Sequence, residues 1–347
     1  MSDRIAFVFP GQGSQSVGMG AELVANSAAA RSIFAAADAA LGFSLSTLCF
    51  EGPEDRLKET INAQPAITTV SLAALAALRE ALGQPDGALI GPPWPAFVAG
   101  HSVGEYTALI ASGAVDFAAG LRLVRERGRL MHLEGTTCDS GMAAVLGLDA
   151  EQLRAICTQA EAEVADEPTV QALRSHHPGA GHVVVANDNA PGQIVLSGER
   201  TALDRAMALA SMAGAKRVIP LVVSGAFHSP VMAPAAPALR SAIDAAGISD
   251  AQTPLVANIT AQPLTQADAL RAELAAQIAS PVQWTRTVAW LAQDGGVSTF
   301  VEIGGGQVLS GLIKRIVKGV TVINVGTSVE AIAAAELLRA RGFGQIA

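Results

Sequence analysis

The sequence predicts an α/β fold with a mostly parallel sheet and a smaller inserted unit, and three observations lead to this class. Short apolar runs, such as residues 5–9 and 96–99, alternate with stretches of helical periodicity. This alternation is typical of a parallel sheet with helices on both faces. The middle of the chain interrupts the pattern with two adjacent strands. A length of 347 residues is also enough for one large domain that carries an insertion.

The first part of the chain predicts strands and helices of the larger unit. The apolar run at residues 5–9 leads into a glycine-rich turn at 10–13, and the run at 96–99 leads into a second turn at 100–104. Glycine and proline at these places favour tight strand-to-helix connections. The remaining elements expected here are helices at 65–82, 105–112 and 117–133 and a loop at 83–95.

The middle of the chain predicts a small inserted subdomain. Its elements follow in the order strand, helix, strand, strand, helix, strand, which is the ferredoxin-like βαββαβ unit. They are expected at residues 142–148, 150–165, 183–186, 193–197, 201–213 and 217–223. We expect the ferredoxin-like subdomain to span residues 138–223, with 166–182 as an extra surface excursion, and the core to comprise residues 1–137 and 224–347.

The last part of the chain returns to the larger unit, because apolar runs and helical periodicity alternate again. The expected elements are strands at 255–259 and 299–303, helices at 267–278, 282–292 and 308–317, and a short helix from Ala331.

Composition excludes several classes of function. The formal net charge of −8 argues against a nucleic-acid surface, because phosphates need a dense field of lysine and arginine. Apolar windows are interrupted before about 18 residues, and the N-terminus has no leader features, so we expect no membrane span and a cytoplasmic protein. Three cysteines, Cys49, Cys138 and Cys157, lack CxxC spacing, so we expect neither disulfides nor a metal site.

The turn at residues 100–104 carries the strongest chemical signal. Gly100-His101-Ser102-Val103-Gly104 matches G-x-S-x-G between a strand and a helix, which is the context of a nucleophile elbow. Flanking glycines let the strand and the helix approach without Cβ clashes, so the serine hydroxyl projects outwards. The sequence therefore predicts an α/β-hydrolase-like core with Ser102 as nucleophile.

A serine nucleophile needs a base, and the chain has six histidines. His228 follows the strand at 217–223 in a loop, where α/β folds place functional groups. We expect His228 to be the base. The other histidines adjoin the serine, end a helix or lie in the excursion: His101, His132, His176, His177 and His182.

Arg127 is the third informative residue. On the helix at 117–133, Arg127 falls in the apolar arc rather than on the charged face. An inward guanidinium is costly unless it is paired, and its planar fork suits a carboxylate. Two interpretations stay open: Arg127 binds the carboxylate of a substrate, or it forms a structural ion pair with an internal Asp or Glu.

Acyl transfer also needs an oxyanion hole, typically the backbone N–H after the nucleophile and another from a loop after a second strand. Val103 supplies the first, and the glycines of the 10–13 turn let the backbone of Gln12 approach a bound carbonyl. Gly11 and Gly13 lack the third glycine of a dinucleotide fingerprint, and no lysine completes a P-loop. We therefore expect no nucleotide site here.

Five motifs follow one another along the chain: Phe9-Pro10-Gly11-Gln12-Gly13-Ser14-Gln15, Gly100-His101-Ser102-Val103-Gly104-Glu105-Tyr106, Arg127-Gly128, Gly225-Ala226-Phe227-His228-Ser229 and Pro281-Val282-Gln283-Trp284. In this combination the sequence resembles the malonyl-CoA:acyl carrier protein transacylase family, over about residues 4–325. The resemblance implies that Ser102 is malonylated, that Arg127 holds the malonate carboxylate, and that Gln283 orients the base His228 through its main-chain carbonyl. It also implies that Gln12 and Val103 form the oxyanion hole.

The resemblance further implies a ping-pong transfer from malonyl-CoA to the phosphopantetheine thiol of acyl carrier protein, without cofactor or metal. Phe227 resembles the malonyl-selective versions, since its bulk leaves no room for a 2-methyl branch. Carrier proteins are usually acidic, so docking should use local cations, and without coiled-coil heptads we expect a monomer. The candidate cations are Lys314, Arg315 and Lys318, or Lys216 and Arg217. Departures from the family pattern are the long 166–182 excursion, Gly305 in place of a common proline and Gln307 in place of a common lysine.

Two rival functions remain at this point. A serine hydrolase, either a patatin-like lipase or a thioesterase, could use the same elbow, and in the patatin case Asp294 of Asp294-Gly295-Gly296 would be catalytic. The glycines after Asp294 are also the expected stop signal of a helix, and the inward Arg127 suits an acidic acyl group better than a lipid. A carrier-protein binding module with a dead site is disfavoured, because nucleophile, base, arginine and oxyanion loop are all present.

Overall fold

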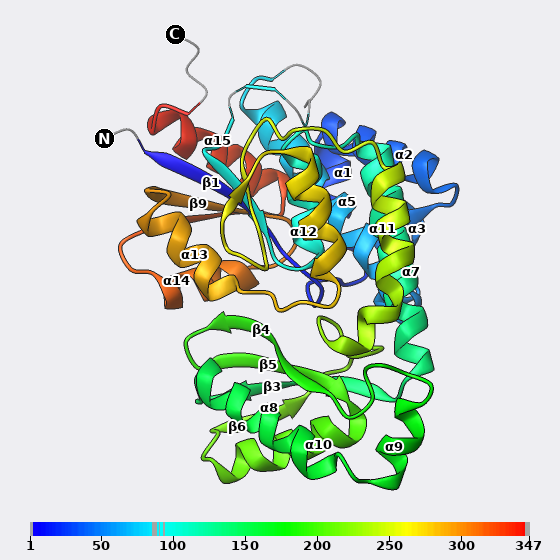
Figure 1. Cartoon of the computed structure of the whole chain (residues 1–347). Coiled ribbons are helices and arrows are strands. Elements are labelled where there is room, and N and C mark those ends of the chain that lie inside the picture. Colours follow the sequence, from blue (N-terminus) through cyan, green and yellow to red (C-terminus); the bar gives the residue numbers. More distant parts are fainter. Residues whose placement is uncertain (1–2, 85–88, 90, 93, 344–347) are drawn as a thin grey trace.

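The computed structural model describes residues 3–84, 89, 91–92 and 94–343 and shows an α/β fold with two sheets (Figure 1). Within these residues the larger sheet has six strands in the order β10-β9-β1-β2-β7-β8, parallel except for β8. The predicted α/β class with a mostly parallel sheet is confirmed. The strands are β1 (Arg4–Phe9), β2 (Phe97–Gly100), β7 (Leu255–Val256), β8 (Pro263–Leu264), β9 (Val297–Ile303) and β10 (Thr321–Val325).

Helices cover both faces of the larger sheet. Strand β1 shows this directly, because Phe7 and Phe9 lie in one hydrophobic core while Ala6 and Val8 lie in another. The first core is formed with α5 and α6, the second with α13 and α14. The helices of this unit are α1 (Ala21–Asn26), α2 (Ala28–Leu41), α3 (Leu45–Glu51), α4 (Glu54–Lys58), α5 (Thr60–Ala81), α6 (Val103–Ala111), α7 (Phe117–Thr137), α11 (Ala236–Ala245), α12 (Ala267–Gln277), α13 (Trp284–Gln293), α14 (Val308–Ile316), α15 (Ser328–Ala340) and the 3₁₀ helix η2 (Pro230–Ala235).

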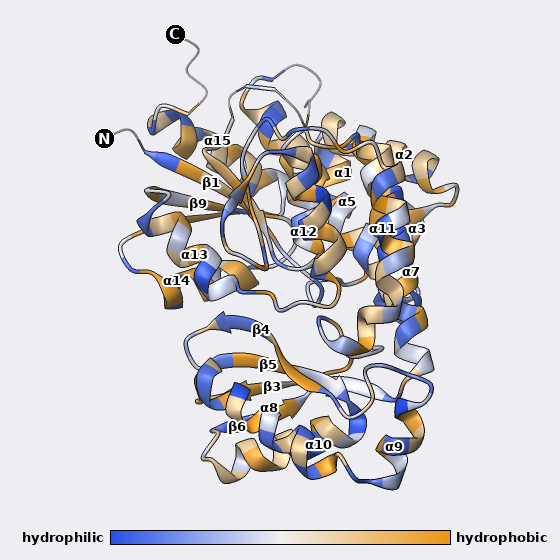
Figure 2. Cartoon of the chain, in the orientation of Figure 1, coloured by the Kyte–Doolittle hydropathy of each residue, from blue (hydrophilic) through white to orange (hydrophobic). Residues whose placement is uncertain are grey.

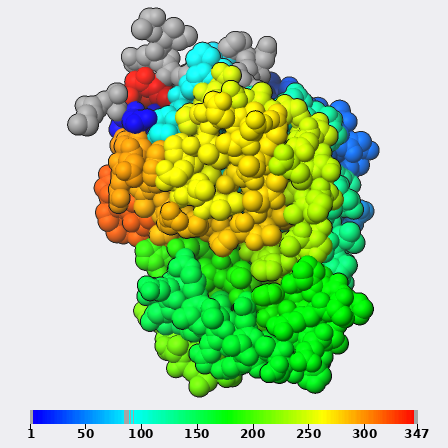
Figure 3. Space-filling view, in the orientation of Figure 1, coloured from blue at the N-terminus to red at the C-terminus, as the bar shows by residue number. Residues whose placement is uncertain are grey.

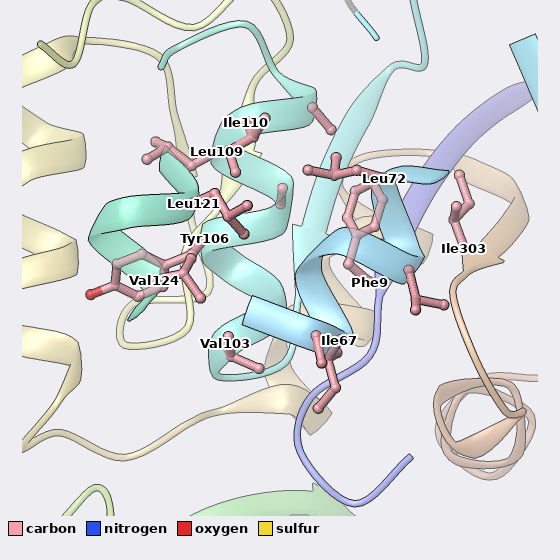
Figure 4. Close-up of a cluster of buried hydrophobic side chains, with 14 of the residues drawn as sticks. Phe9, Ile67, Leu72, Val103, Tyr106, Leu109, Ile110, Leu121, Val124 and Ile303 are labelled. Carbon is pink, nitrogen blue, oxygen red and sulfur yellow. The ribbon is translucent and has the colours of Figure 1, made fainter. Parts of the chain in front are cut away.

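Helix α5 is the one described helix that is long and apolar enough to cross a membrane by length and composition. In this structure, however, 94% of its most apolar window is buried. Figure 4 shows Ile67 and Leu72 of α5 in a cluster with Phe9 of β1 and with Val103 and Tyr106 of α6. Helix α5 thus acts as a core helix, and its packing fixes α6 behind the larger sheet.

The second sheet is antiparallel and has the order β4-β5-β3-β6 among the described residues. Its helices pack on one another and on the sheet around Leu153, Ile156 and Leu203. In Figure 1 this lobe is the green part of the chain, below the larger sheet. Its elements, in chain order, are β3 (Ser140–Leu146), α8 (Ala150–Val164), α9 (Pro168–Arg174), β4 (Val183–Ala190), β5 (Gln193–Glu199), α10 (Arg200–Met212) and β6 (Arg217–Pro220).

Several elements differ from the sequence-based expectation. The expected strand at 255–259 pairs only over Leu255–Val256, because the chain turns after Ala257 and returns antiparallel as β8. The excursion at 166–182 contains α9, buries Val170, and packs so closely that a Cβ on Gly179 would lie 2.5 Å from Val231 Cα. Helices α2 to α4 and strand β10 were not anticipated, and the expected loop at 83–95 lies partly outside the described residues.

Helices at the surface of the larger unit are amphipathic. Figure 2 shows hydrophobic and hydrophilic residues side by side on α11, and α11 buries Leu239 and Ile243. The three cysteines are free and buried among the described residues, so they act as packing residues: Cys49, Cys138 and Cys157.

Gly104 → Ala is expected to destabilise the fold, because strand β1 and helix α6 touch at this glycine. A Cβ on Gly104 would lie 2.2 Å from the backbone oxygen of Phe9, which forces backbone movement and costs about 1–3 kcal/mol or more. Gly311 of α14 is a matched control, since a Cβ there meets nothing within 4 Å and alanine favours a helix. Urea denaturation should show a lower free energy of unfolding for Gly104→Ala and no decrease for Gly311→Ala. Equal stability of both variants would contradict this contact.

Candidate active site

Ser102 lies on a sharp turn between β2 and α6. Its backbone has φ 55° and ψ −109°, a positive φ that residues with a side chain rarely adopt. The turn is possible because Gly100 and Gly104 are in contact, where a Cβ on Gly100 would lie 1.9 Å from Gly104 C. The chain thereby forms the strained elbow that the G-x-S-x-G spacing predicted.

His228 lies within hydrogen-bond distance of Ser102. Its Nε2 lies 2.7 Å from Ser102 Oγ, and its Nδ1 lies 2.9 Å from the main-chain oxygen of Gln277. A carbonyl oxygen can only accept a hydrogen bond, so Nδ1 carries the proton. The unprotonated Nε2 therefore accepts from the serine hydroxyl, as a general base must.

Gln277, and not Gln283, orients His228, so the expectation for Gln283 is wrong. Gln277 is the last residue of α12, where main-chain carbonyls have no intrahelical partner and are free to accept from the imidazole. Gln283 is instead the N-cap of α13, and its carbonyl accepts from Thr287 N at 2.9 Å. Its side chain donates to the carbonyl of Ile259 at 2.6 Å.

Burial keeps His228 uncharged. The imidazole is 2% exposed, and its removal from water, followed by the positive charge of Arg127, lowers its pKa to about 3. Hydrogen bonds to the main chain at Gln277 and Ser280 act in the opposite direction. The histidine is therefore available as a base far below its ordinary titration range.

Arg127 is fully buried and points its guanidinium at the nucleophile. Nη2 donates to Ser102 Oγ at 3.2 Å and to Gln277 Oε1 at 2.9 Å, and Nη1 donates to Gln64 Oε1 at 2.7 Å. The guanidinium lies over the ring of Tyr106, and its buried Nε has no hydrogen-bond partner in the part of the chain that the structure describes.

Neutral amides, rather than an acid, thus surround Arg127. Across the described residues it makes no ion pair within 4.0 Å. The nearby Glu105 is buried, and burial, together with the charge of Glu273, raises its pKa well above the usual value. Of the two interpretations that the sequence left open, this arrangement favours the binding of a substrate carboxylate.

Ser102, Arg127 and His228 line a cavity of about 320 Å³. Gln12 and Val103 line it, with Val103 at the first position of α6, where backbone N–H groups lack intrahelical acceptors. The second lobe contributes part of the wall, and Figure 3 shows this lobe, in green, directly against the larger one. The wall residues from the second lobe and the segment after it are Met142, Asn187, Asn189, Val195, Leu221, Val222, Val223 and Phe227.

Four polar side chains of the site were not singled out from the sequence. Gln64 and Gln277 hold Arg127, Asn258 accepts from Ser102 N, and Asn189 lies 2.7 Å from His101 Nε2. Amides are common on surfaces and in turns, so no spacing or periodicity distinguishes them. Asp294, the acid of the patatin alternative, caps the end of α13 and does not line the cavity.

The fold and this geometry together define an acyl-transferring serine enzyme: a strained serine, a neutral histidine base, and a buried cation that can hold an acidic acyl group. The acyl transferase domain family matches residues 6–333. The malonyl CoA-acyl carrier protein transacylase of Bacillus subtilis is 43% identical over 314 residues, which cover 90% of each chain.

Solved structures agree with this match. The malonyl CoA-acyl carrier protein transacylase of Coxiella burnetii superimposes with a TM-score of 0.85 at 34% identity, covering 97% of this chain and 98% of the other. A malonyl-transacylase in complex with a type II PKS acyl-carrier protein gives a TM-score of 0.84 at 36% identity, covering 96% and 99%. The chain belongs to the acyltransferase family that contains the malonyl CoA-acyl carrier protein transacylases.

Proposed function

We propose that the protein transfers a malonyl group from malonyl-CoA to the phosphopantetheine thiol of acyl carrier protein through a malonyl-serine at Ser102. One observation carries the proposal: His228 Nε2 lies 2.7 Å and Arg127 Nη2 lies 3.2 Å from the same Ser102 Oγ. A base and a carboxylate-binding group therefore meet at one nucleophile. The Bacillus subtilis relative named above supports the choice of malonyl as the acyl group.

In the first half-reaction Ser102 Oγ attacks the thioester carbonyl while His228 Nε2 takes the hydroxyl proton. The negative charge on the carbonyl oxygen is stabilised by the backbone N–H groups of Gln12 and Val103. When the carbon–sulfur bond breaks, His228 returns the proton to the departing thiolate, and coenzyme A leaves. In the second half-reaction the carrier thiol gives its proton to His228 and attacks the malonyl ester, and the proton returns to Ser102.

Arg127 and Phe227 would select the acyl group. The guanidinium binds the free malonate carboxylate and so fixes the thioester carbonyl beside Ser102. Phe227 is 5% exposed and lines the cavity, where its ring opposes a 2-methyl branch on the substrate. The coenzyme A thioester is a substrate in this proposal, and the reaction needs no bound cofactor.

We also infer the finer fold classes, an α/β-hydrolase-like core over residues 1–137 and 224–347 and a ferredoxin-like insertion over 138–223. The strand order β4-β5-β3-β6, the strand and helix order along the chain and the elbow at Ser102 support them.

The proposal is tested by intact mass. The protein is incubated separately with malonyl-CoA and with acetyl-CoA, free coenzyme A is measured, and the adduct is mapped by peptide mass. We expect a malonyl adduct on Ser102, one equivalent of released coenzyme A, and transfer of the adduct to phosphopantetheinylated acyl carrier protein. If neither an adduct nor free coenzyme A forms, the transacylase function is wrong, and esters and lipids become the substrates to test.

Malonylation of Ser102 is expected to keep its rate from about pH 8 down to about pH 5. The reactive form of His228 is the neutral one, and its pKa of about 3 lies below this range, whereas an unshifted histidine would become half protonated near 6.5. Single-turnover malonylation measured by rapid quench tests this. A fall in rate centred near pH 6.5 would show that the imidazole is not desolvated as the structure indicates.

The carrier protein is expected to dock beside α14. Arg315 Nη2 donates to the carbonyl of Pro191 at 2.9 Å, so the basic end of α14 adjoins the turn after Asn189, which lines the cavity. Lys314→Glu with Lys318→Glu should raise KM for an acidic carrier protein about 10-fold at low salt and leave malonylation by malonyl-CoA unchanged. The double variant Lys216→Glu with Arg217→Glu tests the alternative set of cations. If this variant raises KM for the carrier protein instead, the carrier protein docks at β6.

A further inference from the structure

Asn258 joins the two ends of the turn that carries Ser102. Its side chain is fully buried; Oδ1 accepts from Ser102 N at 2.8 Å, and Nδ2 donates to the carbonyl of Gly100 at 2.7 Å. A backbone N–H can only donate and a carbonyl can only accept, so both roles are unambiguous. Asn258 does not line the cavity, so it has no direct contact with a substrate bound there.

The backbone of Asn258 is itself held from two sides. Its N–H donates to Glu105 Oε1 at 2.8 Å, and its carbonyl accepts from Gln283 N at 2.8 Å. The sequence predicts that Gln283 orients His228. In the structure Gln283 instead anchors the segment that contains Asn258. Helices α6 and α13 and the turn after β7 therefore fix the amide before any substrate binds.

The elbow needs such a partner for two reasons. Ser102 has a positive φ that the chain adopts only when its surroundings hold it there. Its N–H also precedes the first turn of α6, where the helix offers no acceptor, and a buried backbone N–H without a partner is rare. A single carboxamide supplies an acceptor for this N–H and a donor for the Gly100 carbonyl, which neither an apolar side chain nor an ionised carboxylate can do.

We propose that Asn258 is a positioning residue that holds the strained elbow so that Ser102 Oγ faces His228 Nε2 and the N–H of Val103 remains free for the oxyanion. The inference rests on the proposed acyl transfer at Ser102. By binding the N–H of Ser102 itself, the carboxamide also orients the next peptide unit, whose N–H belongs to Val103. Loss of the carboxamide would therefore shift nucleophile and oxyanion donor together.

Asn258→Ala tests the proposal, with Asn324→Ala as a matched control. Asn324 Nδ2 also makes two side-chain hydrogen bonds, to Glu302 at 3.1 Å and to Ser310 at 2.7 Å, away from the cavity. We expect Asn258→Ala to lower single-turnover malonylation about 100-fold with unchanged half-saturation by malonyl-CoA. Labelling of Ser102 by a fluorophosphonate should slow in parallel. Asn324→Ala should leave both rates at the wild-type value.

Asn258→Asp supplies a readout that a purely structural role would not move. The new carboxyl would face the elbow, while the buried Glu105 and Glu273 contact the backbone of its own segment, and Arg127 and His228 lie beyond Ser102. When protonated it can still donate to the Gly100 carbonyl, and when ionised it cannot. Its malonylation rate, divided by that of the wild type, should therefore rise as the pH falls, whereas the ratio for Asn258→Ala should not.

Two results would overturn the inference: folded Asn258→Ala acylates and labels at the wild-type rate, or Asn258→Asp shows the same pH-independent deficit as Asn258→Ala. If Asn258→Ala does not fold, the pH dependence of Asn258→Asp decides alone. Fluorophosphonate labelling separates this test from the proposed function. A wild type that is labelled at Ser102 but takes no malonyl group would refute the acyl donor and leave the role of Asn258 to be decided by labelling.

Discussion

Ser102→Ala is expected to abolish the covalent malonyl adduct. It should also abolish the release of coenzyme A that accompanies adduct formation. His228 Nε2 and Arg127 Nη2 both contact Ser102 Oγ, at 2.7 and 3.2 Å, and removal of this hydroxyl leaves the base without a proton to take. Transfer to the carrier protein should fall to the rate of direct thiol exchange, a loss of at least about 10⁴-fold by analogy with other serine nucleophiles. Intact mass and a thiol assay measure the two losses.

The matched control is Ser211→Ala, which removes an exposed hydroxyl on α10 that donates to the carbonyl of Met207. This variant should be acylated at the wild-type rate. A malonyl adduct that persists in Ser102→Ala would mean that another side chain is the nucleophile, and peptide mass would identify it.

Arg127→Ala is expected to lower malonylation about 10³-fold and to leave acetylation by acetyl-CoA little changed. Hydrogen bonds to charged groups are each worth about 1.5–3 kcal/mol, and a bidentate carboxylate forms two of them. Acetyl has no carboxylate and gains nothing from the guanidinium. The malonylation rate of Arg127→Lys should lie between those of the wild type and Arg127→Ala, because an ammonium keeps the charge but not the planar fork of the guanidinium. Competition between malonyl-CoA and acetyl-CoA, read by intact mass, gives the ratio directly.

Arg125→Ala is the control for structural loss on the same helix. Arg125 packs over the ring of Phe43, 4.2 Å from its centroid, and does not line the cavity. Its removal should reduce stability without changing the malonyl-to-acetyl ratio. If Arg127→Ala lowers both acylations equally, its buried guanidinium stabilises the fold rather than the substrate.

The sequence singled out the three residues that meet at the candidate site because each has a local signature. Ser102 lies in a spaced glycine motif, Arg127 breaks a helical pattern, and His228 was selected among the six histidines by its position after a strand. These signals depend on neighbours within a few residues. The parallel sheet was predictable for the same reason, since hydrophobic periodicity is a local property of each strand and helix.

The groups that hold these three residues in place were not predictable in this way. Asn258 reaches Ser102 because β7 pairs with β2 in the register Val98 with Leu255 and Ala99 with Val256, which brings the residues after both strands to one edge. Gln277 reaches His228 because α12 ends there. Both facts depend on which elements become neighbours and on where a helix stops, and neither can be read from one segment alone.

Gln277 connects the three residues that we propose take part in the reaction. Its main-chain oxygen accepts from His228, its side-chain oxygen accepts from Arg127, and its side-chain nitrogen donates to Ser102 O at 3.0 Å and to Glu105. Substitutions among these residues therefore cannot be treated as independent. The free energies lost in single variants should not sum to the loss in a double variant, so no fixed share of the catalytic power belongs to any one of them.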